Sequence, residues 1–198
     1  LQKIEEHFEQ MKTEVVNYKG RFEYENRDYK GNTKDNWTAT LLYVQGKNIN
    51  TGKGIIPNFH KDIPSISKFI NSGIPNLSMS AISIMEPNTH IKTHSDAENL
   101  CYRIQLVLKA DKNAALQSAD KIAHYKEGEL IIFRHSDFHE AWNYGDSERI
   151  VLVMDILLPS FDMQDFLDLR RIQNKLRPYY KKEYEWEKDT IFDMIKKF

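Results

Sequence analysis

Residues 89–106 of the chain read THIKTHSDAENLCYRIQL. Two histidines, His90 and His94, and the carboxylate Asp96 fall within seven positions, and Arg103 interrupts an otherwise apolar run. Ionisable groups gathered beside a β-strand are unusual, because a charged side chain is costly to bury without a partner. A bound metal would account for them together, and other parts of the chain offer the further ligands that a metal site needs.

The segments around this stretch have the alternating, turn-bounded pattern of short β-strands. Their spacing is typical of a sandwich or barrel. The expected strands are residues 37–46, 77–86, 101–109, 121–127, 129–134, 139–143 and 148–157. The sequence therefore predicts a mainly β core.

Helices are expected on both sides of this core. Apolar residues recur at helical spacing in the first 20 or so residues and again after residue 157, where Pro178 is expected to end the helix. A short helix before Gly73 is also expected. We predict one domain over residues 1–198, with a helical lead-in (1–36), a β core (37–157) and a C-terminal helical extension (158–198).

The composition excludes some classes of partner. Of the 198 residues, 40% are hydrophobic and 29% charged, and the formal net charge is -1, which favours neither nucleic acid nor anionic lipid. No apolar run approaches the roughly 20 residues that span a membrane. The one cysteine, Cys101, rules out an internal disulfide, so a cytoplasmic location is expected.

A metal site needs ligands beyond one short motif. On a strand, His94 and Asp96 would face the same side, and a second histidine would complete the 2-His-1-carboxylate triad of non-haem Fe(II) oxygenases. His139 is the candidate, with Arg149 ten residues later. If residues 143–145 form a three-residue hairpin loop with Gly145 left-handed, positions 139 and 149 pair and share a face. A four-residue loop would place them on opposite faces.

Arg149 begins a strand that is apolar on both faces apart from Asp155. A buried guanidinium needs an anionic partner, supplied either by the protein or by a ligand. A dicarboxylate cosubstrate that chelates iron at one end and meets the arginine at the other would satisfy it. Arg103 is a second such arginine, and Gln105 lies on the same strand face.

Two longer segments carry a family resemblance: residues 80–108, SAISIMEPNTHIKTHSDAENLCYRIQLVL, and residues 128–156, GELIIFRHSDFHEAWNYGDSERIVLVMDI. With NWTATLLYVQG before them, they resemble the aspartyl/asparaginyl β-hydroxylase family of Fe(II)/2-oxoglutarate-dependent oxygenases over residues 37 to 157. The resemblance implies a double-stranded β-helix (jelly roll, cupin-like) fold and the cosubstrates 2-oxoglutarate and O2.

The resemblance also implies site residues. His94 and His139 match the family's metal histidines. Asp96 stands where the animal members have glycine, so it would restore the usual carboxylate ligand and weaken the transfer of a peptide substrate. The positions matched around the cosubstrate are Arg149 and Ser83 at its distal carboxylate, the nearby Arg103, and Gln105, where the family often has a histidine.

The implied activity is hydroxylation of an unactivated C–H bond, with 2-oxoglutarate converted to succinate and CO2. The substrate is expected to be a small molecule, or an Asp/Asn-type amino acid or peptide, and the family's lipid-hydroxylating branch is not favoured because no membrane segment is found. Two alternatives stay open: a metal-dependent jelly-roll enzyme that does not use 2-oxoglutarate, and a noncatalytic ligand-binding barrel.

Other polar and aromatic residues have less specific interpretations. His90 is expected to lie outside the metal's ligand set, and His135 has no assigned role. Trp37 and Trp142 are expected to pack in the core, with Trp142 also a candidate wall of the site. The C-terminal segment mixes basic and aromatic residues, but nearby acidic residues cancel much of the charge. A helix that covers the barrel, or a lid, is expected there rather than a nucleic-acid site.

Overall fold

The structure is a computed structural model that describes residues 2–18, 36–44, 47–48, 59–96 and 99–180. The helices are α1 (Gln2–Val16), α2 (Phe59–Asp62), α3 (Pro64–Ile70) and α4 (Met163–Tyr180). The strands are β1 (Trp37–Val44), β2 (Lys47–Asn48), β3 (Leu77–Met85), β4 (Thr89–His94), β5 (Cys101–Lys109), β6 (Ala114–Ser118), β7 (Lys121–His124), β8 (Leu130–Phe133), β9 (His139–Asn143) and β10 (Arg149–Leu157).

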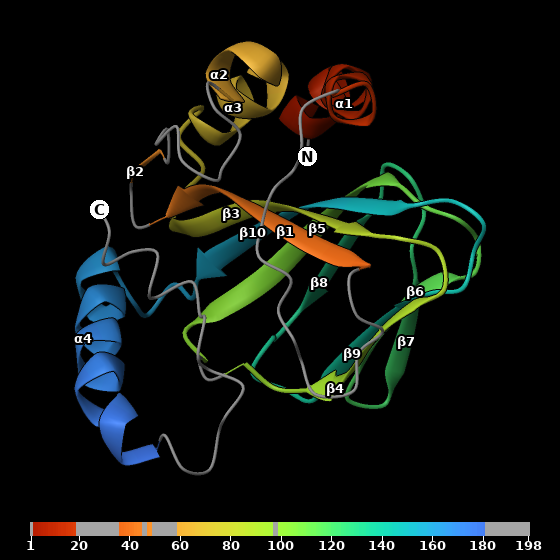
Figure 1. Cartoon of the computed structure of the whole chain (residues 1–198). Coiled ribbons are helices and arrows are strands. Elements are labelled where there is room, and N and C mark those ends of the chain that lie inside the picture. Colours follow the sequence, from red (N-terminus) through yellow and green to blue (C-terminus); the bar gives the residue numbers. More distant parts are fainter. Residues whose placement is uncertain (1, 19–35, 45–46, 49–58, 97–98, 181–198) are drawn as a thin grey trace.

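These strands form two antiparallel sheets that face each other (Figure 1). The larger sheet has the order β2-β1-β3-β10-β5-β8 and the smaller one β4-β9-β6-β7. From β3 to β10 the chain passes back and forth between the sheets, which is the jelly-roll arrangement of a double-stranded β-helix. The predicted mainly β, jelly-roll fold class is confirmed.

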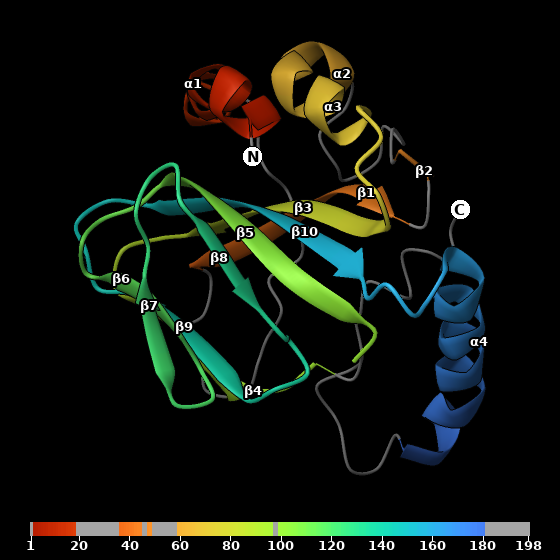
Figure 2. The same ribbon diagram turned by 180° about the vertical axis from the view of Figure 1, so that it is seen from behind.

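The central strands β3 and β10 of the larger sheet are buried on both faces, which explains their continuous apolar runs. Along β10, Ile150 and Leu152 pack with Met11 of α1 and residues of α3 on the outside. Val151 and Val153 point the other way and pack with Leu116 of the smaller sheet. Figures 1 and 2 show α1, α2 and α3 above the larger sheet and the smaller sheet below it.

Helix α4 lies at the end of the barrel where β10 finishes (Figure 2). Phe166 packs there with Leu100, Cys101 and Leu157. The helix includes Pro178 and continues to Tyr180, so the prediction that Pro178 ends it was wrong by two residues. A proline near the last turn forfeits few helical hydrogen bonds. The predicted segments 19–35 and 181–198 lie outside the described residues.

The predicted hairpin between His139 and Arg149 was wrong. β9 and β10 belong to different sheets, so residues 139 and 149 are not cross-strand partners. Gly145 lacks a left-handed φ, and glycine is needed for another reason: a Cβ there would lie 2.2 Å from Cβ of Asp111. Residues 144–148 therefore carry the chain from one sheet to the other.

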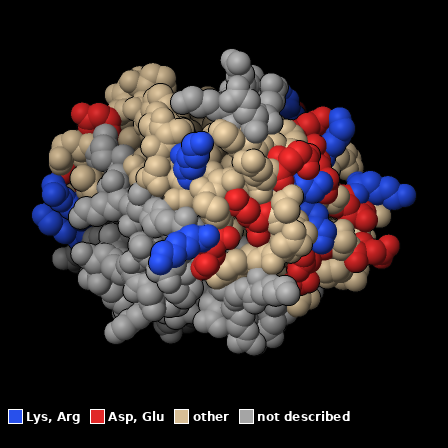
Figure 3. Space-filling view, turned by 90° about the horizontal axis from the view of Figure 1, so that it is seen from above, with Lys and Arg blue, Asp and Glu red and all other residues tan. Residues whose placement is uncertain are grey.

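Strand β6 was not predicted, because AALQS contains no β-branched or aromatic residue. Gly73 has φ of 81° just after α3, as expected for the end of a helix. On the helix-bearing face, acidic and basic side chains of the described residues are intermixed (Figure 3). This mixture agrees with the nearly balanced composition.

Candidate functional site

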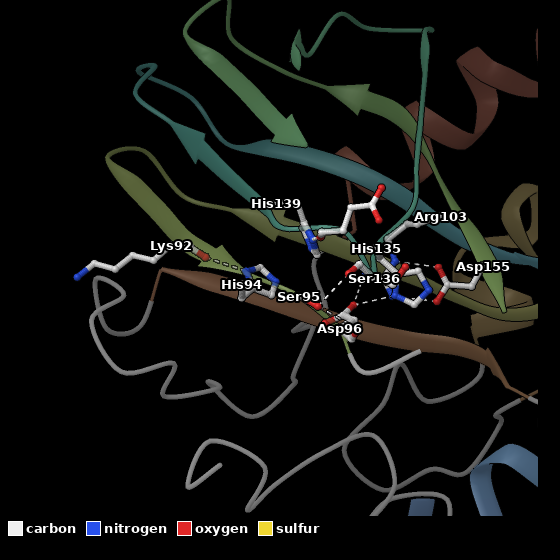
Figure 4. A network of polar contacts seen from close by, with 10 residues as sticks. Lys92, His94, Ser95, Asp96, Arg103, His135, Ser136, His139 and Asp155 are labelled. Carbon is white, nitrogen blue, oxygen red and sulfur yellow. Dashed lines mark hydrogen bonds and ion pairs between the residues drawn. The ribbon is translucent and has the colours of Figure 1, made fainter. Parts of the chain in front are cut away.

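The two predicted metal histidines lie side by side on neighbouring strands of the smaller sheet. His94 of β4 is paired directly with His139 of β9, and the ring centroids are 4.2 Å apart. Nδ1 of His94 contacts the carbonyl oxygen of Lys92 at 2.7 Å (Figure 4). Nδ1 of His139 contacts the carbonyl oxygen of Asp137 at 2.8 Å. A carbonyl only accepts, so each Nδ1 carries the proton and each Nε2 keeps a lone pair suited to a metal.

His139 is also electrically suited to bind a cation. Burial lowers the pKa of His139 to about 4, and the neighbouring His94 adds to the effect. The imidazole is therefore neutral at physiological pH, as a metal ligand must be. Phe133 of the larger sheet lies against this ring, with centroids 5.2 Å apart, so His139 faces the interior between the sheets.

Asp96 lies beyond the end of β4, so the prediction that it shares a strand face with His94 was wrong. Its backbone N–H donates to the carbonyl oxygen of His135 at 2.9 Å. Its Oδ2 accepts from Nη1 of Arg103 at 2.9 Å and contacts Nδ1 of His135 at 3.0 Å (Figure 4). Burial alone would raise the pKa of Asp96, but Arg103 and His135 outweigh it and hold the pKa well below its usual range.

Arg103 connects this carboxylate to the larger sheet. It faces Asp155 across the β5–β10 pair, with Nε to Oδ1 at 2.8 Å and Nη2 to Oδ2 at 2.9 Å. Such a two-point pair fixes the plane of the guanidinium. The structure thus places Arg103, the predicted cosubstrate arginine, against two carboxylates of the protein, Asp96 and Asp155.

The donor set can be compared with the needs of a metal. Among the described residues, no three His, Cys, Asp or Glu side chains already stand close enough together to hold an ion. Oδ1 of Asp96, however, accepts no hydrogen bond within the described ranges. Two Nε2 atoms and this oxygen are the donor types of a 2-His-1-carboxylate iron site. The chemistry of the residues therefore fits Fe(II), with Asp96 engaged elsewhere.

Arg149 forms a second centre inside the barrel. Its side chain is only 2% exposed, and Nη2 donates to Oγ of Ser83 at 3.4 Å. Nε has no hydrogen-bond partner, and no carboxylate in the described part of the chain pairs with the guanidinium. Burial lowers the pKa of Arg149, although nearby Tyr125 opposes the shift. Such a buried cation is incomplete without an anion.

Three further residues are linked to Arg149, one directly and two through Ser83 or Tyr125. Trp37 donates from Nε1 to Oγ of Ser83 at 2.9 Å. The guanidinium of Arg149 lies over the Tyr125 ring, with Cζ of Arg149 5.1 Å from the ring centroid. The Tyr125 hydroxyl donates to Oε1 of Gln105 at 2.9 Å. We call Trp37, Ser83, Gln105, Tyr125 and Arg149 the Arg149 cluster.

Sequence reasoning named most of these side chains but not their partners. Asp155, Tyr125 and the role of His135 were missed; an acidic residue within the apolar run 149–157 was the one available signal. His90 lies on the outer face of the smaller sheet, with Nε2 3.1 Å from Glu140 and Nδ1 3.1 Å from the Tyr144 hydroxyl. His90 therefore lies on the opposite face of the sheet from the His139 ring, which faces the interior.

The fold and site define a double-stranded β-helix protein with two adjacent histidines. Its interior also holds a buried arginine that no carboxylate of the described residues neutralises. Residues 1–159 match the sequence profile of the family described as aspartyl/asparaginyl beta-hydroxylase. The chain belongs to this hydroxylase family, as the sequence resemblance predicted.

Individual relatives cover parts of the chain. It is 34% identical to the ornithine lipid ester-linked acyl 2-hydroxylase of Rhizobium tropici over 89 residues. The matched segment covers 43% of this chain and 32% of that protein. It is 29% identical over 133 residues to the aspartyl/asparaginyl beta-hydroxylase of Mus musculus, which is 66% of this chain and 17% of that protein. The chain thus matches about a third or less of the length of these relatives.

Solved structures show a more distant likeness. A protein with a double-stranded beta-helix domain from Klebsiella pneumoniae gives a TM-score of 0.36 at 19% identity, covering 41% of this chain and 69% of that one. The Cnp3 cupin domain of Schizosaccharomyces pombe gives 0.37 at 10% identity, covering 49% and 62%. None of the helices within the described ranges is long and apolar enough to cross a membrane.

Proposed function

We propose that the protein is an Fe(II)/2-oxoglutarate-dependent dioxygenase that hydroxylates an unactivated C–H bond. The observation that carries the proposal is Arg149, a guanidinium buried without a carboxylate partner in the described structure. A dicarboxylate cosubstrate would supply the missing charge through a charge-assisted hydrogen bond. Family membership supports the hydroxylase class.

Iron would be held by Nε2 of His94, Nε2 of His139 and Oδ1 of Asp96. Bound iron would supply the activation of O2 that C–H hydroxylation requires. The protein's residues do the remaining work. Backbone carbonyls fix the two imidazoles, while Arg103 and His135 keep Asp96 ionised.

The distal carboxylate of 2-oxoglutarate would bind Arg149 and the hydroxyl of Ser83. Ser83 already accepts hydrogen bonds from Trp37 and Arg149, so its own proton is left to donate. The apolar neighbours Val151 and Val153 line the same inner face of β10 and would exclude water from the reacting groups.

The substrate is proposed to be a small molecule, or an amino acid or peptide of the Asp/Asn type. An acyl chain of a lipid belongs in the first screen as well, because 89 residues of this chain are 34% identical to an acyl 2-hydroxylase. A screen for succinate formation with the three substrate classes would separate them.

The decisive experiment is an anaerobic titration of the apoprotein with Fe(II) and then 2-oxoglutarate, followed through the visible charge-transfer band of the chelate. The band should appear in wild type, and in Arg149→Met the 2-oxoglutarate requirement should rise by at least about tenfold, since a hydrogen bond to a charged group contributes about 1.5–3 kcal/mol. Arg149→Met should unfold no more easily than wild type, because an apolar side chain removes an unpaired buried charge. Arg171→Met, at an exposed position of α4, is the matched control.

Other outcomes would support the alternatives. Iron binding without the band would indicate a metal-dependent jelly-roll enzyme that does not use 2-oxoglutarate. Failure to bind iron would indicate a noncatalytic barrel. An unchanged 2-oxoglutarate requirement in Arg149→Met would mean that the arginine does not serve the cosubstrate.

A further inference from the structure

Tyr125 is a member of the Arg149 cluster to which neither the motifs nor the family resemblance gave a role. It follows β7, is buried, and its backbone N–H donates to the carbonyl oxygen of Ala114 at 3.0 Å. Three residues later, Gly128 has φ of 82° and donates to the carbonyl oxygen of Val107 at 2.9 Å. The loop is therefore tied to both sheets, and these hydrogen bonds hold the backbone that carries Tyr125.

The direction of the Tyr125 hydrogen bond can be deduced. Burial raises the pKa of the Tyr125 phenol, although Arg149 opposes the shift, so the hydroxyl keeps its proton. A buried hydroxyl proton needs an acceptor, and the contact available to it is Oε1 of Gln105 at 2.9 Å. The opposite orientation of the amide would leave the phenol proton without a partner.

This contact determines what Gln105 presents to its surroundings. With the amide oxygen held by Tyr125, its NH2 group is the side left to interact, and within the described ranges it has no acceptor. Nε of Arg149 also lacks an acceptor, and so does the hydroxyl proton of Ser83. The cluster is thus a set of hydrogen-bond donors, complementary to a ligand that only accepts.

We propose that Tyr125 is a positioning residue for the dicarboxylate cosubstrate, acting through Gln105 and Arg149. Its hydroxyl fixes the Gln105 amide so that the NH2 group donates to a carboxylate oxygen of the ligand, and its ring supports the Arg149 guanidinium through a cation–π contact. This inference rests on the proposed use of 2-oxoglutarate. It also explains how glutamine serves where the resembling family often has histidine.

The test measures binding rather than turnover. Anaerobic calorimetry with the Mn(II)-loaded protein gives the Kd for 2-oxoglutarate in wild type, Tyr125→Phe, Gln105→Met and the double variant. Phenylalanine keeps the ring beneath Arg149 and removes only the hydroxyl. Loss of the Gln105 contact to a charged oxygen should raise Kd by about 10–100-fold, and loss of its orientation in Tyr125→Phe by about 3–10-fold.

The double variant distinguishes positioning from simple structural support. If Tyr125 acts through Gln105, the double variant should bind no more weakly than Gln105→Met alone. Tyr144→Phe is the matched control: it removes a tyrosine hydroxyl from its contact with His90 on the outer face, and Kd should not change. Thermal unfolding of each variant checks that the fold is intact.

The contrary results are distinct. A Tyr125→Phe protein that binds 2-oxoglutarate as wild type does would overturn the inference, as would fully additive losses in the double variant. If wild type itself binds no 2-oxoglutarate while holding Mn(II), the proposed function fails, and the inference falls with it.

Discussion

At the scale of single residues, the two carboxylate oxygens of Asp96 have different surroundings. Oδ2 is held by Arg103 and His135, and Oδ1 has no hydrogen bond from the described residues. In the proposed site, Oδ2 would orient the carboxylate and Oδ1 would be the oxygen that binds the metal. The Nε2 atom of His135 is buried and has no hydrogen-bond partner among the described residues, so the contact that His135 makes to Asp96 is through Nδ1.

His135→Phe should weaken metal binding while leaving the fold intact. Phenylalanine fills the buried space and removes the contact to Asp96, and loss of such a supporting contact typically costs about 10–100-fold in metal affinity. Anaerobic calorimetry with Mn(II) would measure the change. His90→Phe, on the outer face of the same sheet, is the control. Equal affinities in the two variants would show that the His135 contact to Asp96 does not support metal binding.

Arg149 shows the cost that a binding residue imposes on its own fold. A guanidinium buried without a carboxylate destabilises the unliganded protein, and an apolar replacement of similar volume is often neutral or stabilising. Retention of Arg149 is understandable if a ligand supplies the missing charge. The unfolding measurement on Arg149→Met described above tests this reasoning directly.

At the scale of elements, β10 connects the two ends of the site. Every second residue of β10 lies on its inner face: Arg149, Val151, Val153 and Asp155. At the usual rise per residue, the backbone positions of Arg149 and Asp155 are about 20 Å apart. Arg103 pairs with Asp155 at the end of β10 near Asp96, and Arg149 lies at the opposite end of the strand. The same strand therefore orients both arginines, each toward a different part of the interior.

The connection between β9 and β10 depends on close packing at Gly145. An added methyl group there would lie 2.2 Å from Cβ of Asp111, so Gly145→Ala should destabilise the fold by about 1–3 kcal/mol, as overpacking does. Urea unfolding would measure the loss. Adding Asp111→Gly removes the obstructing side chain and should recover part of the stability. Wild-type stability in Gly145→Ala would mean that the segment shifts freely.

At the scale of the whole molecule, the jelly roll brings side chains from different sheets to one interior. His94 and His139 come from the smaller sheet, and Arg103 and Arg149 from the larger one. Metal bound between β4 and β9 would hold two neighbouring strands together, so binding and folding should be coupled.

Metal should therefore stabilise the fold. At a free Mn(II) concentration of about 100 times Kd, the free energy of unfolding should rise by about 2.7 kcal/mol, provided that the unfolded chain does not bind the ion. For a chain of this size, the melting temperature should increase by about 5–10 °C. Thermal unfolding with metal and with excess chelator would show the difference. His139→Ala should lose most of the shift, and an equal shift in that variant would place the metal elsewhere.

Local patterns predicted much of the fold. Apolar alternation located β1, β3, β5 and β8, together with the strands that begin at His139 and Arg149. β6 was not predicted because its residues have little intrinsic preference for strands. They form a strand through pairing with β7 and β9. Two assignments stay predictions. The first is the set of metal ligands, His94, Asp96 and His139, and the second is the set of cosubstrate residues, Arg149, Ser83, Arg103 and Gln105.

By itself, the sequence determined the class of the fold, the family, and the identity of the polar residues set into apolar strands, because periodicity and charge in a hydrophobic run are local properties. The tertiary structure decided the partners. Only it separated His139 and Arg149 into two sheets, paired Arg103 with Asp155, and brought Tyr125 against Gln105. These contacts join positions distant along the chain, and their geometry depends on how two sheets pack rather than on any short pattern of residues.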